Sequence, residues 1–159
     1  MKETENKLDL IFDLTKKAFE EIFFEMIDEK IESGDSFEIN AEKKMGIIVG
    51  LAGEINGKIL LTASLEHAKN LASKVVSGME LIEEKDLYIY LGKFSGLFCN
   101  RATKFINAQS QKKELGITPP AFFSAKELYI STPHVECQKA YYKSELGDFI
   151  LEIGIREEY

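Results

Sequence analysis

Apolar residues recur every three or four positions in the first part of the chain. At about 100° per residue, those between positions 7 and 32 fall on one side of a helix, and charged residues fall on the other side. The apolar stripe comprises Leu8, Ile11, Phe12, Phe19, Ile22, Phe23, Met26 and Ile27. This pattern predicts a long amphipathic helix that ends near Gly34, followed by a polar segment, 35–44, that forms a loop or a short edge strand.

Two short apolar segments, 45–52 and 58–64, have the composition of β-strands. The dipeptide between them, Asn56-Gly57, best fits a two-residue type I′ turn, because both central positions of that turn need a positive φ. Three glycines lie in this region: Gly50, Gly53 and Gly57. Their spacing matches neither GxGxxG nor GxxxxGK[ST], so a β-hairpin explains them better than a phosphate-binding loop does.

Two further helices are expected after the hairpin. The first covers residues 65–76, with His67 and Lys74 pointing outward, and the second covers residues 83–108. Pro119-Pro120 then interrupts the chain, because proline lacks the backbone donor that regular structure needs.

Strand-like segments follow the prolines. They are 121–124 continuing into 128–131, 135–143, and 148–156, with a turn at 146–148. The predicted order is therefore a long N-terminal helix, a β-hairpin, two helices, and antiparallel strands that complete one sheet. This order predicts an α+β layered fold, and the length of 159 residues fits a single domain, 1–159.

The third predicted helix has two contrasting sides. Its expected buried stripe is Leu87, Leu91, Phe94, Phe98, Ala102 and Phe105. The opposite side carries Lys93, Gly96, Asn100, Thr103, Lys104 and Asn107. Glycine inside an exposed helix costs roughly 0.5–1 kcal/mol relative to alanine. Gly96 therefore reflects close approach of another backbone, simple drift, or a docking surface.

Charge and composition exclude several classes of function. The formal net charge is −7, which argues against nucleic-acid binding and against docking on anionic lipid. No apolar segment approaches the roughly 20 residues that cross a bilayer, and the charged N-terminal residues lack the features of a signal peptide. Cys99 and Cys137 form no CxxC pair, so we expect a cytoplasmic protein without a disulfide framework.

Metal and nucleophilic sites are weakly indicated. His134 and Cys137 lie three positions apart on a predicted strand, where they would point to opposite faces, and His67 has no ligand neighbour. Cys99 lies near the margin of an apolar stripe with no histidine beside it, which favours a role in the core. We expect no cofactor and no metal.

Two stretches resemble the CheX-like family of bacterial chemotaxis phosphatases, the CheC, CheX and FliY type. Residues 92–102, GKFSGLFCNRA, are similar to its helix motif, which begins with glycine and glutamate, has asparagine three residues after the glutamate, and glycine four residues further on. Ile117-Thr118-Pro119-Pro120 matches the ITPP element that follows the helix. The hairpin that begins at Val49 is also similar, so the resemblance covers roughly residues 45 to 157.

The resemblance implies a homodimer that joins sheets and a phosphatase acting on the aspartyl phosphate of the response regulator CheY. In the family, the asparagine holds the attacking water and the glutamate pairs with a regulator lysine, so catalysis proceeds by positioning. Any Mg²⁺ would belong to the regulator. The glutamate position is Lys93 here, the asparagine position is Gly96, and the later glycine is Asn100. Lys93 reverses a charge and Gly96 removes the amide, so the resemblance implies a degenerate catalytic pair.

Three functional hypotheses follow. In the first, the chain is a CheX-like module that binds a CheY-type regulator or self-associates through a face of Lys93, Gly96, Asn100, Lys104 and Asn107, without strong phosphatase activity. In the second, it is an active phosphatase that uses other residues, with Asn100 and Lys93 as first candidates. In the third, it is a structural dimerisation module outside chemotaxis.

Overall fold

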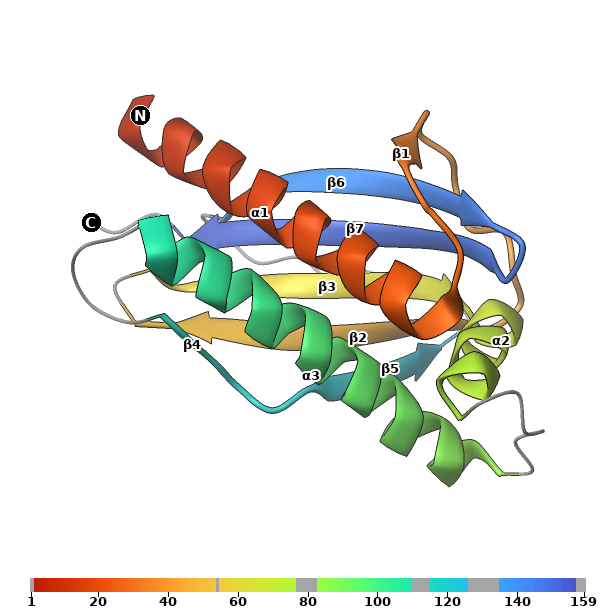
Figure 1. The fold of residues 1–159 in the computed structure, drawn as a ribbon. Coiled ribbons are helices and arrows are strands. Elements are labelled where there is room, and N and C mark those ends of the chain that lie inside the picture. The colour runs from red at the N-terminus through yellow and green to blue at the C-terminus, as the bar shows by residue number, and fades with distance from the viewer. Residues whose placement is uncertain (1, 54, 77–82, 110–114, 126–134, 157–159) are drawn as a thin grey trace.

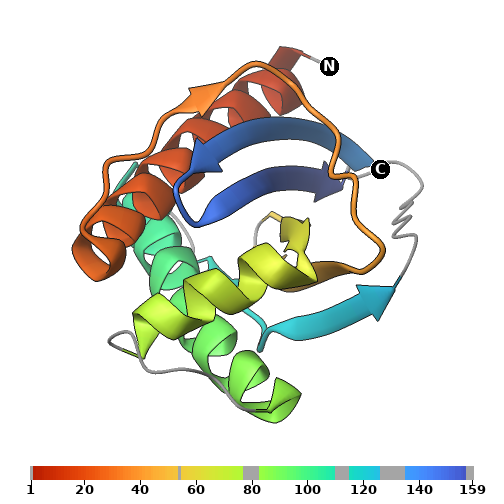
Figure 2. The ribbon, with the colours of Figure 1, turned by 90° about the vertical axis from the view of Figure 1, so that its right-hand side faces the viewer.

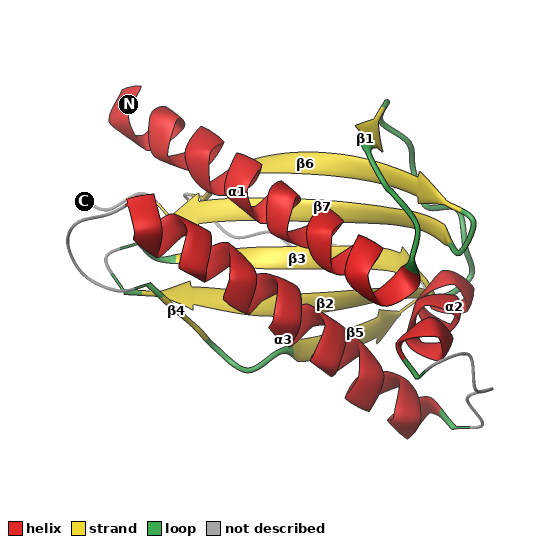
Figure 3. Ribbon diagram, viewed as in Figure 1, coloured by secondary structure: helices red, strands yellow, loops and turns green. Residues whose placement is uncertain are grey.

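In the computed structural model, helices α1 (Lys2–Ile27) and α3 (Glu84–Gln109) cross one face of an antiparallel sheet, and α2 (Leu65–Val75) lies at the end of the strands (Figures 1 and 3). The structure describes residues 2–53, 55–76, 83–109, 115–125 and 135–156. The strands are β1 (Ser33–Gly34), β2 (Lys44–Ala52), β3 (Gly57–Ser64), β4 (Gly116–Ile117), β5 (Ala121–Ala125), β6 (Val135–Ser144) and β7 (Gly147–Arg156).

The seven strands run in the order β1-β6-β7-β3-β2-β4, and β5 also pairs with β2. Every pairing is antiparallel. The last residues of β2 pair with β4 and its first residues pair with β5, so these two short strands share one edge. Figure 2 shows α1 and α3 on one side of the sheet and α2 across the ends of the strands. The predicted α+β class and order of elements are therefore confirmed.

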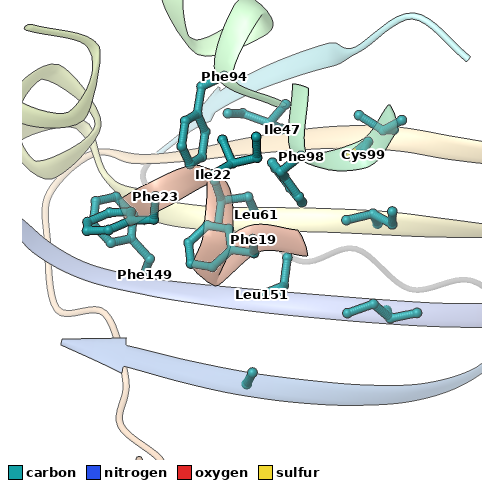
Figure 4. Packing of buried hydrophobic residues seen from close by; sticks show 14 of the residues in the cluster. Phe19, Ile22, Phe23, Ile47, Leu61, Phe94, Phe98, Cys99, Phe149 and Leu151 are labelled. Atoms are coloured by element: carbon teal, nitrogen blue, oxygen red, sulfur yellow. The ribbon is translucent and has the colours of Figure 1, made fainter. Parts of the chain in front are cut away.

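Helices α1 and α3 lie side by side across the sheet, and Phe19 of α1 occupies the centre of the contact (Figure 4). Its ring meets Phe94 and Phe98 of α3 edge-on, at centroid separations of 5.9 and 5.4 Å. On the sheet side it lies 4.8 Å from the ring of Tyr142. Such aromatic pairs add about 0.5–1.5 kcal/mol each to the apolar burial. This cluster holds α3 in a fixed orientation, with one side always turned to solvent.

The first helix ends earlier than the apolar pattern predicts. Asp28 has a φ of 61°, and its N–H donates to the carbonyl oxygen of Phe24 at 2.9 Å, which closes the helix in a left-handed cap. Aspartate tolerates this conformation better than most residues do. The helix therefore ends without the glycine that would have marked its end in the sequence. Ile31 is nevertheless buried, although it lies outside the helix.

The hairpin is confirmed, but the predicted turn is wrong. Gly57 lies within β3 opposite Leu51, so the connection is longer than two residues, and Gly53 carries the positive φ of 140°. A Cβ on Gly57 would collide with the carbonyl oxygen of Gly154 in the neighbouring β7. Glycine is needed at this position for close strand packing rather than for turn geometry.

His67 does not point outward, in contrast to the prediction. It is half-buried, and its Nδ1 accepts a hydrogen bond from the backbone N–H of Asp148 at 3.0 Å. Its ring occupies the space beside Gly147, where any Cβ would collide with it. His67 therefore joins α2 to the turn between β6 and β7. The predicted strand segment 128–131 lies outside the described residues.

Candidate functional site

One side of α3 is buried against α1 and the sheet, largely as the sequence predicts. The buried residues include Leu87, Leu91, Phe94, Phe98 and Ala102. The stripe ends differently, because Ile106 is buried while Phe105 is only half-buried beneath the ammonium of Lys17, 4.7 Å from its ring centroid. The solvent side of α3 is therefore well defined over about five turns.

We define the α3 face as the solvent-facing residues Ile89, Lys93, Gly96, Leu97, Asn100 and Lys104. Helical spacing places them within about 100° of one another. The sequence analysis missed its two apolar members, Ile89 and Leu97, which are 63% and 42% exposed. The sequence spacing could have identified them, because they lie four residues before and four residues after Lys93 and therefore beside that lysine on the helix. Exposed apolar side chains beside free polar groups are a common composition for a docking surface.

Gly96 leaves an open notch in this face. A Cβ built on Gly96 meets no described atom within 4 Å, apart from its own helix backbone and neighbours. By contrast, a Cβ on Gly92 would meet the ring of Phe122 at 3.4 Å. Close packing within the described chain therefore accounts for Gly92 but not for Gly96. No described backbone segment of this chain therefore approaches Gly96 closely enough to require a glycine there.

Two other polar residues that helical spacing assigns to the same side have structural roles. The Asn107 amide donates to the carbonyl oxygen of Leu115 at 3.1 Å and accepts from the Leu115 N–H at 2.8 Å. Thr103 is buried, and its hydroxyl donates to the backbone carbonyl of Asn100 at 2.8 Å. Asn107 thereby joins the end of α3 to the segment that enters β4.

The side chains of Lys93, Asn100 and Lys104 are different, because they form no hydrogen bond or ion pair with any described residue. All three are exposed. These three side chains are therefore available to a partner, in contrast to Asn107 and Thr103.

The α3 face is basic although the chain as a whole is acidic. No aspartate or glutamate occurs between positions 87 and 109 of the sequence. Arg101, which lies to one side, is engaged by α1: it forms an ion pair with Glu21 at 3.2 Å and a two-pronged contact with Glu25. The hydrogen bonds from Arg101 lower the pKa of Glu25. Among the described residues, Lys93 and Lys104 therefore supply the charge of the face that no ion pair compensates.

The Ile117–Pro120 element forms the sheet edge next to this helix. Thr118 is bound to Gly50 of β2, and Pro119 and Pro120 separate β4 from β5. Phe122, the second residue of β5, packs on Tyr88 of α3 at a centroid distance of 5.2 Å. The element thus connects the helix to the sheet edge and contributes no free chemical group to the α3 face.

Other candidate sites receive little support. Cys99 is buried, and burial raises the pKa of its thiol, which suits a core residue. Cys137 is exposed on β6, and His134, which was expected to point to the opposite face of that strand, lies outside the described residues. Within the described part of the chain, no cluster of three or more His, Cys, Asp or Glu side chains is placed to hold a metal. No helix described here is both long and apolar enough to span a bilayer.

A groove of about 470 Å³ lies over the outer side of α1, away from the α3 face. It is lined by Asp13, Lys16, Lys17, Glu20, Glu21, Phe24, Lys30, Ile31 and Glu32. Because acidic and basic side chains alternate around it, the groove favours neither sign of ligand charge. The α3 face, with its single sign of charge and its open notch, is the better-defined candidate.

Solved structures share the fold of this chain, although no protein-family model and no curated protein matches its sequence. CheX from Desulfovibrio desulfuricans aligns with a TM-score of 0.78 at 15% identity, covering 92% of this chain and 99% of that one. A CheC-like superfamily protein from Shewanella aligns at 0.77 with 14% identity, covering 93% and 98%. A chain of the CheX–CheY–BeF₃–Mg²⁺ complex from Borrelia burgdorferi aligns at 0.75 with 23% identity, covering 92% and 97%.

These alignments define the structural class: the chain has the layered fold of the CheC-type proteins. Two of these three structures contain CheX, one of them together with CheY, and the likeness to them is one of fold. The fold expected from the resemblance is therefore confirmed.

Proposed function

We propose that this chain is a CheX-like module of chemotaxis signalling that binds a CheY-type response regulator through the α3 face. The observation that carries the proposal is an exposed helix face with two apolar side chains and three polar side chains that pair with no described residue. It occurs on a fold shared with a chain crystallised in a CheX–CheY complex, a match that spans nearly the whole length of both. Any Mg²⁺ belongs to the regulator in this proposal.

The proposed module lacks strong phosphatase activity. Lys93 stands where the resemblance requires a glutamate, and Gly96 stands where it requires the amide that holds water. In-line hydrolysis of an aspartyl phosphate depends mainly on positioning, and about 1 Å of misplacement can cost a hundredfold in rate. The open space at Gly96 leaves no side chain to position the water at that point.

Binding to the CheY-type regulator encoded in the same genome tests the proposal. We expect saturable binding by titration calorimetry, and we expect Leu97→Asp to weaken it by at least about tenfold, because an apolar contact becomes a buried charge. Leu10→Asp is a matched control, since Leu10 is 44% exposed on α1 and Leu97 is 42% exposed on α3. Absence of binding by the unaltered chain contradicts the proposal.

A working phosphatase is the second candidate, and the unpaired Asn100 amide favours it. Asn100 lies four residues beyond Gly96, about 6 Å along the helix axis, on the same side. If Asn100 positions water, the chain accelerates dephosphorylation of the regulator and Asn100→Ala abolishes that acceleration. Equal rates with and without the unaltered chain exclude this candidate.

Self-association is a separate part of the proposal. In the described structure β5 pairs with β2 alone, so its other edge is open, and Phe123 on this strand is 43% exposed. Open strand edges favour pairing with a second strand. We expect a dimer by sedimentation, and a dimer without regulator binding would support the structural role outside chemotaxis.

A further inference from the structure

We propose that Lys93 and the notch at Gly96 make this chain selective for the phosphorylated form of its regulator. In this inference, which rests on the proposed function, the ammonium of Lys93 contacts the anionic phosphoryl group rather than a partner lysine. The chain then acts as a reader of the phosphorylated state, since it retains a contact to the phosphoryl group without the means to position water.

No charged residue of α3 lies within one turn of Lys93, and the nearest acidic residue on the same side, Asp86, lies two turns away. The neighbours of Lys93 three and four residues away are Ile89, Tyr90, Gly96 and Leu97, and all are uncharged. The Lys93 ammonium forms no ion pair with a described residue. A partner lysine opposite Lys93 would meet like-charge repulsion, whereas an anionic group would gain a charge-assisted hydrogen bond.

The notch gives an anionic group room to approach. Because no described atom outside the helix lies within 4 Å of a Cβ built on Gly96, a partner group can reach the helix surface at this point. Lys93 precedes the notch by about 4.5 Å along the axis and Asn100 follows it by about 6 Å. Lys93 and Asn100 flank the notch on either side, and the Cα–Cβ bond of Asn100 tilts toward it because helical side chains lean toward the N-terminus. Both side chains carry N–H donors.

The donor set favours a phosphoryl group over a single carboxylate. Lysine has three N–H donors and no acceptor, and the asparagine amide has two more donors, so together they suit a group with several acceptor oxygens. A phosphoryl group presents three such oxygens and about −1.5 to −2 charges near pH 7. Lys104, which lies further along the same face and pairs with no described residue, adds to the positive potential.

The test compares affinities for the regulator with Mg²⁺ alone and with Mg²⁺ plus beryllofluoride, which mimics the phosphoryl group. For the unaltered chain we expect binding to be at least about fivefold tighter with beryllofluoride. Lys93→Met removes the charge and keeps the aliphatic stem, so we expect the ratio of the two affinities to fall toward one. Lys69→Met is the control, since Lys69 is exposed on α2.

The outcomes separate this inference from the proposed function. If Lys93→Met binds both forms and keeps the preference, the selectivity does not come from Lys93 and the inference is overturned, while the proposed function stands. Equal affinity of the unaltered chain for both forms also overturns the inference and leaves the proposed function standing. If the unaltered chain binds neither form, the proposed function itself fails. Circular dichroism spectra of the variants show whether each one is folded.

Discussion

Thr118 binds Gly50 through two hydrogen bonds that run in opposite directions. The Gly50 N–H donates to Thr118 Oγ1 at 2.8 Å, and the Thr118 N–H donates to the Gly50 carbonyl oxygen at 2.9 Å. The threonine side chain also fills the space where a Cβ on residue 50 would lie. This contact fixes the Ile117–Pro120 element on β2 where the prolines interrupt the edge of the sheet.

Replacing the hydroxyl of Thr118 tests the contact. Thr118→Val keeps the shape but loses the acceptor, so we expect the free energy of unfolding to fall by about 0.5–1.5 kcal/mol in urea titrations. Thr118→Ser retains the hydroxyl and is expected to lose less. Equal stability of the valine variant and the unaltered chain would show that water replaces the bond at no cost.

Two asparagines that follow the same side of α3 should respond differently to truncation. Asn107→Ala removes both hydrogen bonds to Leu115, and we expect a loss of about 1–2 kcal/mol in unfolding free energy. Asn100→Ala removes an exposed amide with no described partner, so a change within about 0.5 kcal/mol is expected. A larger loss in Asn100→Ala than in Asn107→Ala contradicts the assignment of the two roles.

Two glycines give changes of opposite sign when replaced by alanine. Gly57→Ala should destabilise the fold by about 1–3 kcal/mol, because the new methyl group meets the Gly154 carbonyl oxygen. Gly96→Ala should stabilise the fold by about 0.5–1 kcal/mol, because the site is open and alanine favours the helix. Chemical denaturation measures both. Loss of stability in Gly96→Ala would mean that the notch is filled.

The carboxyl group of Glu20 should make stability depend on pH. Burial raises its pKa above the ordinary value of 4.5, although Lys16 and the hydroxyl of Tyr142 act in the opposite direction and Glu32 adds to the increase. A raised pKa in the folded state means that ionisation favours unfolding, so this contribution to stability is lost as pH rises above 4.5 through the folded-state pKa.

Glu20→Gln removes that ionisation while keeping an acceptor for the Tyr142 hydroxyl. We expect the variant to melt at a higher temperature than the unaltered chain at pH 7, and at a similar temperature at pH 4. Glu38→Gln changes the same charge on an exposed residue and serves as the control. A variant that melts at a lower temperature at pH 7 would contradict the direction of the shift.

Restoring the family pair should create phosphatase activity if the scaffold docks as proposed. In Lys93→Glu with Gly96→Asn, the new amide enters open space and the charge at position 93 returns to the family pattern. We expect dephosphorylation of the regulator to accelerate by at least about tenfold over the unaltered chain. Lys93→Glu with Gly96→Ala is the control, since it lacks the amide. Binding without any gain would show that the pair alone does not position the water.

The sequence predicted the elements well where a single periodic pattern governs them. The stripe from Leu8 to Ile27 and the alternation from Phe149 to Ile155 both face the core, because burial of one face is what each period encodes. Predictions were wrong where a local contact decided the outcome. Asp28 ends α1 without a glycine, and Gly57 is required by a neighbouring strand rather than by a turn.

By itself, the sequence determined the α+β class, the order of the elements, and the identity of the residues at the motif positions, Lys93 and Gly96. Only the tertiary structure decided which residues on that side of α3 are free. Asn100 and Asn107 lie on the same helical side and look equivalent in sequence. Asn107 is engaged because the entry into β4 passes beside it, and Asn100 is free because no described element covers it. Helical periodicity specifies a direction from the axis, whereas the presence of a neighbour depends on how distant segments pack.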